Sequence, residues 1–240
     1  MPPTKSKLNV SDSALPYILY QRTEYLRSNP LFLFLTYVGV VPFLYKITVW
    51  LKTKLFASRI KQAFCADMQA EYDRLRDHLP SHADSILDIG CGVAGIDVFL
   101  GRHYRFNPRI YLLDKTATDP VVYYGFESKG SVYNSLDVSR DMLIANGVAP
   151  GQIHTQEATD QNEILFPESF DIVISLISWG FHYPVLTYIE TVHQKMKPGG
   201  VLIIDIRTGT GGEQDISRFF GTYETIYQSG KVTRILARKS

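Results

Sequence analysis

Apolar and polar positions alternate in a regular way from residue 60 onward. Several short runs are apolar on both faces, as expected of strands buried inside a parallel sheet. The segments between them repeat apolar residues at three- and four-residue steps, which is the spacing of helices. The runs span residues 85–89, 109–114, 153–158, 170–177 and 201–206. This alternation predicts an α/β protein built around a parallel sheet.

The end of the chain departs from this alternation. Residues 223–228 and 231–237 both have the composition of strands, and only Ser229 and Gly230 separate them. So short a connection joins antiparallel neighbours. We therefore expect an antiparallel edge on the parallel sheet, with no residues left for the second nucleotide-binding half that an NAD-binding protein would need.

The turn after the first strand is the most informative stretch for function. Residues 90–95 (GCGVAG) match the G-x-G-x-x-G pattern of dinucleotide sites. Glycine permits a positive φ and a close approach of the backbone to a ligand, and the start of the following helix presents unpaired N–H groups. Gly90, Cys91 and Gly92 are therefore candidate cofactor-binding residues.

Asp88 distinguishes between the cofactors that this turn could bind. Its carboxylate stands two positions before the first glycine, where it would repel a pyrophosphate. A ligand with cationic groups fits better, and S-adenosylmethionine (SAM) carries both an ammonium and a sulfonium group. The alternative is that Asp88 only caps the turn, as aspartates often do.

Three further residues complete the candidate cofactor site. Asp114 ends the second strand and follows Gly95 by about 20 residues, the spacing at which α/β nucleotide sites place a carboxylate for the ribose hydroxyls. An acid in an ordinary turn is the alternative interpretation. Glu157 and Ala158 end the third strand, at the place from which the edge of an adenine could be read.

Acceptor chemistry is expected in the segment after the fourth strand. Residues 178–184 follow this strand and contain His182, whose imidazole titrates near neutral pH and is a candidate general base. Tyr183, or Tyr124 from the aromatic loop 115–130, would orient the acceptor. A loop histidine bonded to the backbone is the alternative interpretation of His182.

Composition and charge set residues 1–59, an N-terminal helical extension, apart from the expected catalytic domain at residues 60–240. Residues 1–62 hold nine lysines and arginines against two acidic residues, although the whole chain has a net charge of +1. Residues 28–45 carry no charge, but their apolar run is too short for a membrane span. Either these residues form a helical cap over the acceptor pocket, or residues 31–61 bind a membrane surface.

Cysteine usage and charge distribution argue against several other classes. Cys65 and Cys91 have neither disulfide nor metal-ligand spacing, which favours a reducing compartment. The first residues are polar, so we expect no signal peptide and a cytoplasmic protein, with peripheral membrane attachment as an open alternative. The basic residues are spread among apolar ones, so no nucleic-acid partner is expected. No acid lies between Asp171 and Glu190, so we expect no metal at the acceptor site.

Together, five stretches resemble the class I SAM-dependent methyltransferase superfamily over roughly residues 60–240: ILDIGCGVAG, IYLLDK, QEATD, FDIVISLISWGFHYP and KPGGVLIIDIR. The resemblance implies a Rossmann-like, seven-stranded, mostly parallel sheet with an antiparallel C-terminal strand, helices on both faces, and SAM across the strand ends. It implies the methionine part at Asp88, Gly90 and Gly92, the ribose at Asp114, the adenine at Glu157 and Ala158, and the sulfonium above the stretch from Ser175 to Ser178.

The same resemblance implies a reaction and narrows the acceptor. SAM would donate a methyl group to a small-molecule, sugar or lipid-linked acceptor, most simply at a hydroxyl. Methylases of base amino groups carry Asn/Asp-Pro-Pro-Tyr after the fourth strand, whereas residues 178–181 here read SWGF. Two alternatives stay open, an NAD-dependent oxidoreductase and a catalytically silent SAM-binding or membrane scaffold.

Overall fold

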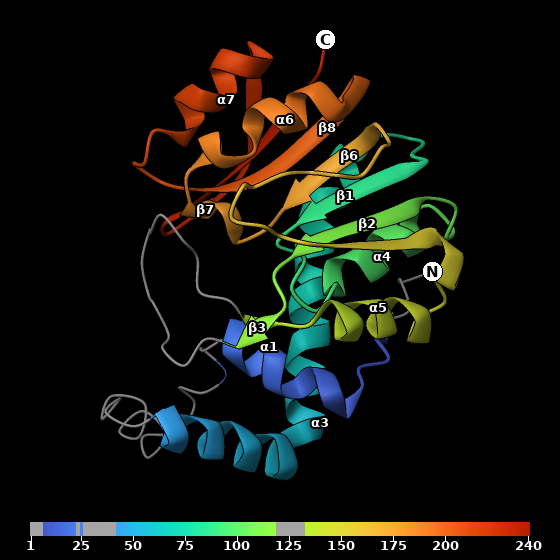
Figure 1. Ribbon diagram of the computed structural model, residues 1–240, viewed down its shortest axis with the longest axis vertical. Helices are drawn as coiled ribbons and strands as arrows, with labels where there is room; N and C mark the ends of the chain where they lie inside the picture. The colour runs from blue at the N-terminus through green and yellow to red at the C-terminus, as the bar shows by residue number, and fades with distance from the viewer. Residues whose placement is uncertain (1–6, 23–24, 26–41, 119–132) are drawn as a thin grey trace.

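The computed structural model describes residues 7–22, 25, 42–118 and 133–240, which form a central sheet with helices on both faces (Figure 1). Seven strands run in the order β5-β2-β1-β6-β8-β10-β9. Their bounds are β1 Ser85–Ile89, β2 Arg109–Asp114, β5 Ile153–Glu157, β6 Phe170–Ser175, β8 Met196–Arg207, β9 Tyr223–Ser229 and β10 Val232–Arg238. The predicted Rossmann-like, seven-stranded α/β fold is confirmed.

Strand β1 lies in the middle of the parallel part of the sheet. It pairs in parallel with β2 on one side and with β6 on the other, so that Asp88 stands opposite Leu112 and Ile174. Strands β6 and β8 are also parallel, whereas β10 is antiparallel to both β8 and β9. The antiparallel hairpin expected at the end of the chain is thereby confirmed.

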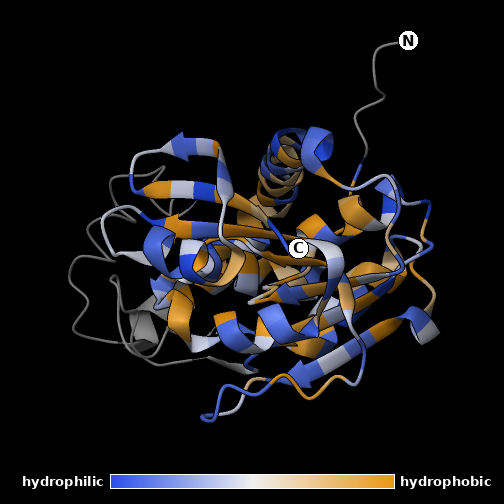
Figure 2. Cartoon of the chain, turned by 90° about the horizontal axis from the view of Figure 1, so that it is seen from above, coloured by the Kyte–Doolittle hydropathy of each residue, from blue (hydrophilic) through white to orange (hydrophobic). Residues whose placement is uncertain are grey.

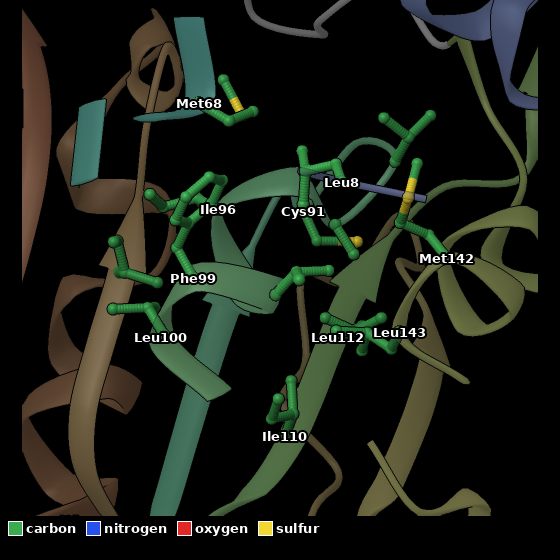
Figure 3. Close-up of a cluster of buried hydrophobic side chains, with 14 of the residues drawn as sticks. Leu8, Met68, Cys91, Ile96, Phe99, Leu100, Ile110, Leu112, Met142 and Leu143 are labelled. Atoms are coloured by element: carbon green, nitrogen blue, oxygen red, sulfur yellow. The ribbon is translucent and has the colours of Figure 1, made fainter. Parts of the chain in front are cut away.

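Two hydrophobic clusters, one on each face of the sheet, hold the helices in place. The helices are α1 Leu15–Gln21, α3 Pro42–Leu75, α4 Gly95–His103, α5 Leu136–Ala145, α6 Ile189–Lys195 and α7 Gly212–Phe220. One cluster joins Met68 of α3 and Phe99 of α4 to Leu112 of β2 (Figure 3). The other joins Val192 of α6 and Ile216 of α7 to the opposite face of the sheet. Figure 2 shows hydrophobic residues concentrated along the central strands, as a sheet covered on both faces requires.

The N-terminal segment contributes to the first cluster. Leu15, Ile18 and Leu19 of α1 are at most 1% exposed and share this cluster with α3 and α4. Helix α3 begins at Pro42 and continues across the predicted boundary at residue 59, and it is interrupted at Phe56, whose φ of −126° and ψ of 20° are not helical. The domain boundary after residue 59 stays a prediction.

Part of the predicted cap or membrane segment, residues 26–41, lies outside the described residues. Within the described part of the chain, no helix combines the length and the apolar character that crossing a bilayer requires. Residues 42–61 are the described part of this segment, so the structural evidence on whether it forms a cap or binds a membrane surface comes from them.

Short strands form where the pattern indicates no strand. Strand β3 (Ala117–Thr118) pairs antiparallel with β4 (Tyr133–Asn134), and α5 starts after this pair, at Leu136. Strand β7 (Ser178–Tyr183) lies beside the end of β8. Pairs of two residues are too short to show a two-residue period, so the sequence pattern could not reveal β3 and β4.

A buried ion cluster ties the last strand to β8 and α3. Arg234 of β10 is 1% exposed and donates two hydrogen bonds to Asp205 of β8, from Nε to Oδ1 at 2.7 Å and from Nη2 to Oδ2 at 2.9 Å. Its Nη1 lies 2.7 Å from Oε2 of Glu71 on α3. Because the Asp205 side chain is fully buried, its charge is compensated only as long as Arg234 is present.

We predict that Arg234→Met lowers the free energy of unfolding by about 3–5 kcal/mol, because it leaves the Asp205 carboxylate buried without a cation. Urea denaturation measures this loss. Arg238→Met, at the exposed end of the same strand, is the control and should change the free energy by less than about 0.5 kcal/mol. Equal losses in the two variants would contradict the role assigned to the buried cluster.

Candidate active site

The candidate site lies at the carboxyl ends of the parallel strands, where the chain leaves β1. Strand β2 lies on one side of β1 and β6 on the other, so consecutive connections leave in opposite directions from this point. In open α/β sheets such a switch point is where ligands bind. The residues that follow β1, β2, β5 and β6 therefore meet at one edge of the sheet, as the sequence predicts.

Two glycines in the turn after β1 are required by their surroundings. Gly90 has a φ of +77°, and a Cβ on it would lie 1.8 Å from Oγ of Ser178. Gly92 has a φ of +53°, and a Cβ there would lie 2.7 Å from Oε1 of Gln21 in α1. Residues with a side chain rarely adopt such φ values. The turn is thus in close contact with both β7 and α1.

Asp114 is held by the turn and by β4. Its Oδ2 accepts hydrogen bonds from Gly92 N at 2.8 Å and from Asn134 Nδ2 at 2.9 Å, and its Oδ1 accepts one from Lys115 N at 2.7 Å. Burial raises the pKa of Asp114 to about 6, although these hydrogen bonds lower it. Asp114 therefore holds the turn in place. Its Oδ1 accepts fewer hydrogen bonds than its Oδ2, so Oδ1 can still accept one from a hydroxyl of a ligand.

Asp88 and Asp97 form a buried pair of carboxyl groups beside the turn. Asp88 ends β1, Asp97 lies in the first turn of α4, and the two are 3% and 0% exposed. Neither Oδ1 of Asp88 nor either oxygen of Asp97 has a hydrogen-bond donor within the described chain. Burial, and then the neighbouring Asp97, raises the pKa of Asp88 well above its usual value. Burial raises the pKa of Asp97 to about 6.

Asp97 and Asn134 are site residues that the sequence analysis missed. Asp97 could have been noticed as the one acid in the otherwise apolar start of a helix, residues 95–100. Asn134 carries no comparable signal, because it reaches Asp114 through the short strand β4 and lies 20 residues further along the chain.

The remaining predicted cofactor residues lie at the same edge. Ala158 N donates to the main-chain oxygen of Asp114 at 2.8 Å, and the Glu157 carboxylate accepts a hydrogen bond from Thr116 N. Burial, followed by the nearby acids, raises the pKa of the Cys91 thiol well above its usual value, so the thiol stays protonated. The structure thus brings these residues together with Asp88 and Asp114, and their roles toward a cofactor stay predictions.

Ser175 supports the site from within the fold. It is fully buried, its Oγ donates to Ile89 O at 2.7 Å, and the same Oγ accepts a hydrogen bond from Trp179 N at 3.0 Å. The Trp179 ring is also fully buried, and its Nε1 donates to Val185 O at 2.9 Å. These contacts hold the start of β7 against the end of β1.

The predicted acceptor residues are only partly brought together. Burial is the main cause that raises the pKa of Tyr183, followed by the neighbouring Tyr188, and Asp114 and Asp88 also raise it. His182 is half-buried. Tyr124 lies outside the described residues.

Ile177, directly before β7, has a strained backbone conformation. Ile177 has a φ of +52°, which is unfavourable for a β-branched side chain. Its N–H donates to Asp205 Oδ2 at 3.2 Å, and Asp205 is in turn fixed by Arg234. Strain of this kind persists only where the surroundings enforce it, and it is frequent at functional sites.

Other parts of the described chain do not compete with this edge as a catalytic site. A cavity of about 530 Å³ lies at the opposite ends of the strands and is lined by residues including Ser85, Arg109 and Lys197. It contains none of the predicted site residues. Within the described residues, no group of three or more histidines, cysteines or acids is arranged to hold a metal ion.

Comparisons with known proteins identify the fold. No family model matches the chain, and no curated protein matches it. Many solved structures do match, and three of them have a TM-score of 0.50. The first is a T. Thermophilus 16S rRNA methyltransferase in complex with AdoMet and guanosine (17% identity, covering 74% of this chain and 43% of that one). The second is a ribosomal protein methylase from Lactobacillus delbrueckii subsp. bulgaricus (12%, 69% and 75%), and the third is a protein from Nostoc punctiforme assigned as an O-methyltransferase (15%, 80% and 60%).

The fold is that of the class I SAM-dependent methyltransferases. The matched region spans less than half of the T. Thermophilus chain, so that enzyme has substantial parts without a counterpart here.

We predict that Asp97→Asn stabilises the protein above pH 6 and not near pH 4. A carboxyl group whose pKa rises from 3.8 to about 6 on folding keeps its proton in the folded state, so stability falls as the pH rises through this interval. At pH 8 the asparagine should add about 1–3 kcal/mol, because it removes a buried charge and can donate to Asp88. Thermal unfolding at the two pH values measures the difference.

The matched control is Asp137→Asn, which changes an exposed acid in the first turn of α5. It should lower stability slightly at pH 8, because an acid there interacts favourably with the helix dipole. A stabilisation by Asp97→Asn that is the same at both pH values would show that the carboxyl pair does not titrate in this way.

Proposed function

We propose that this chain transfers a methyl group from SAM to a hydroxyl of a small-molecule, sugar or lipid-linked acceptor. The observation that carries the proposal is the set of buried carboxylate oxygens without donors beside the glycine turn, at Asp88 and Asp97. Buried acceptors of this kind cost free energy until a donor or a cation meets them. The ammonium group of SAM is such a partner, and the residues present therefore fit this cofactor.

Two observations disfavour a nicotinamide cofactor at the same turn. A pyrophosphate would approach Asp88, Asp97 and Asp114, and among the described residues no lysine or arginine side chain lowers the pKa of these three acids, since Lys115 meets Asp114 only through its main-chain N–H. The antiparallel strand β10 also occupies the place at which a second nucleotide-binding half would continue the sheet. The T. Thermophilus neighbour was solved with AdoMet, which supports the same choice.

Residues of this chain would contact three parts of the cofactor. Asp88 would accept from the ammonium group, Oδ1 of Asp114 would accept from a ribose hydroxyl, and Ala158 would lie beside the adenine with Glu157 at its rim. When bound, SAM supplies a methyl group that is electrophilic because its sulfur is positively charged. The protein then has to align the acceptor with this methyl group and exclude water.

A hydroxyl acceptor must also lose its proton, and β7 offers two residues for this part of the reaction. The raised pKa of Tyr183 keeps its hydroxyl protonated near neutral pH, so we assign Tyr183 to donating a hydrogen bond that orients the acceptor. His182 is the candidate general base, because neutral imidazole can accept a proton near pH 7. The hydroxyl acceptor class rests on the SWGF sequence after the fourth strand.

We predict that isothermal titration calorimetry detects binding of SAM and of its demethylated product, and no binding of NAD. Asp114→Asn should weaken SAM binding by at least about tenfold, equivalent to about 1.4 kcal/mol, because it removes an acceptor for the ribose and loosens the turn. Asp137→Asn again serves as the control and should bind SAM like the wild type. Binding of NAD in preference to SAM would refute the proposal.

We also predict that His182→Ala lowers kcat for a hydroxyl acceptor by about 100-fold or more, while the Kd of SAM is unchanged. Tyr183→Phe should mainly raise the KM of the acceptor, because it removes a positioning hydrogen bond. Radiolabelled methyl transfer to a panel of sugars, lipid-linked sugars and an rRNA oligonucleotide identifies the acceptor used for these measurements. A wild-type rate in His182→Ala would remove His182 from the reaction, and turnover on the oligonucleotide alone would overturn the acceptor class.

A further inference from the structure

The first half of α3 exposes an unusual concentration of large apolar side chains. Trp50 is 58% exposed, Leu51 39% and Leu55 69%. On a helix with 100° per residue these three positions and the exposed Lys54 fall on one side. We call these four residues, together with Arg59 just beyond the bend at Phe56, the α3 surface.

The opposite side of the same helix is firmly attached to the protein. Val49 is 1% exposed and belongs to the first hydrophobic cluster. Lys52 is 4% exposed, and its ammonium donates to Tyr25 O at 2.6 Å. Just after the bend, Lys61 lies 2.7 Å from Asp12. The apolar side chains are thus presented outward by an anchored helix.

The charge of this segment is positive. From Tyr25 to Ala66 the sequence contains no acidic residue. Lys52 points to a partner inside the protein, whereas Lys54 and Arg59 are exposed beside the apolar residues. One acid from another segment lies nearby: the exposed Asp12 pairs with Lys61, and Lys61 and Lys54 both lower the pKa of its carboxyl group. Tryptophan, leucine and lysine on one exposed helix side, without acids, is the composition of helices that lie in the headgroup region of a membrane. A positively charged surface of this kind complements anionic lipids.

We propose that the α3 surface docks on a lipid bilayer that carries anionic headgroups. Trp50, Leu51 and Leu55 enter the headgroup region, and Lys54 and Arg59 contact lipid phosphates. This proposal does not depend on the methyl-transfer reaction.

Docking through this surface has a geometric consequence for the candidate active site. Helix α1 lies between the first half of α3 and the carboxyl ends of the strands (Figure 1), and Gln21 of α1 touches the glycine turn at Gly92. The α3 surface therefore lies on the side of the molecule to which the strands point. A docked protein would hold its candidate active site close to the bilayer, within reach of an acceptor carried on a lipid.

The protein contains a built-in probe for this proposal. It has two tryptophans, and Trp179 is fully buried while Trp50 is 58% exposed. Vesicles of phosphatidylcholine with phosphatidylglycerol should shift the emission of Trp50 to shorter wavelength and reduce its quenching by acrylamide. Pure phosphatidylcholine vesicles should have a much smaller effect, and high salt should reverse the shift because the headgroup attraction is screened.

Variants assign the binding to the α3 surface. In vesicle co-sedimentation with the full chain, the double variant Leu51→Glu with Leu55→Glu should lower partitioning by at least about tenfold. Leu165→Glu, at a leucine that is 63% exposed on another part of the surface, is the matched control and should bind like the wild type. Trp50→Phe should still bind and should lose the spectral shift.

Several results would overturn the proposal. Failure to sediment with anionic vesicles, or equal binding by the double variant and Leu165→Glu, excludes a lipid surface at this helix. A blue shift that grows with protein concentration without vesicles would show that a second copy covers it. Emission that is already blue-shifted and unquenched in dilute protein would show that the chain covers Trp50 itself. Calorimetric SAM binding on the same preparation is a separate readout, so the two proposals can fail independently.

Discussion

Burial of three carboxyl groups around one glycine turn is the constraint on which the candidate site depends. Asp88, Asp97 and Asp114 come from β1, α4 and β2, and no lysine or arginine among the described residues offsets their charge. Asp114 is stabilised by donors from the turn and from Asn134, whereas Oδ1 of Asp88 and both carboxylate oxygens of Asp97 have no donor among the described residues. The turn is therefore held in place at Asp114, while no positive charge compensates Asp88 and Asp97. Such an environment favours a cationic ligand.

Much of the fold and part of the site follow from the sequence alone. Strands that are apolar on both faces can only be buried in a covered parallel sheet, so the pattern identifies β1, β2, β6 and β8 directly. Once the strands are parallel, the residues at their carboxyl ends share an edge, which is why Asp88, Gly90, Asp114 and Ala158 meet as expected. Local pattern and chain connectivity were sufficient for these residues.

The missed features depend on contacts between distant segments. Helix α7 was overlooked because it follows a glycine-rich stretch, and β7 because its residues were assigned to a loop. The hydrogen bonds of Ser175 to the backbone at the end of β1 and at β7 were not predicted either, and its place beneath the cofactor stays a prediction. Arg234 and Asp205 lie far apart in sequence, and no periodicity indicates that they pair. Each of these features forms through contacts between segments that lie far apart in the sequence, and local propensity does not indicate such contacts.

The strained backbone at Ile177 has a consequence for how this protein can diverge. The glycine turn is held through Asp114 to β4, whereas the start of β7 is held through Asp205 to the C-terminal hairpin. Because the two attachments are separate, substitutions in the hairpin can change the start of β7 without disturbing the glycine turn. The two parts of this edge can therefore change independently during evolution.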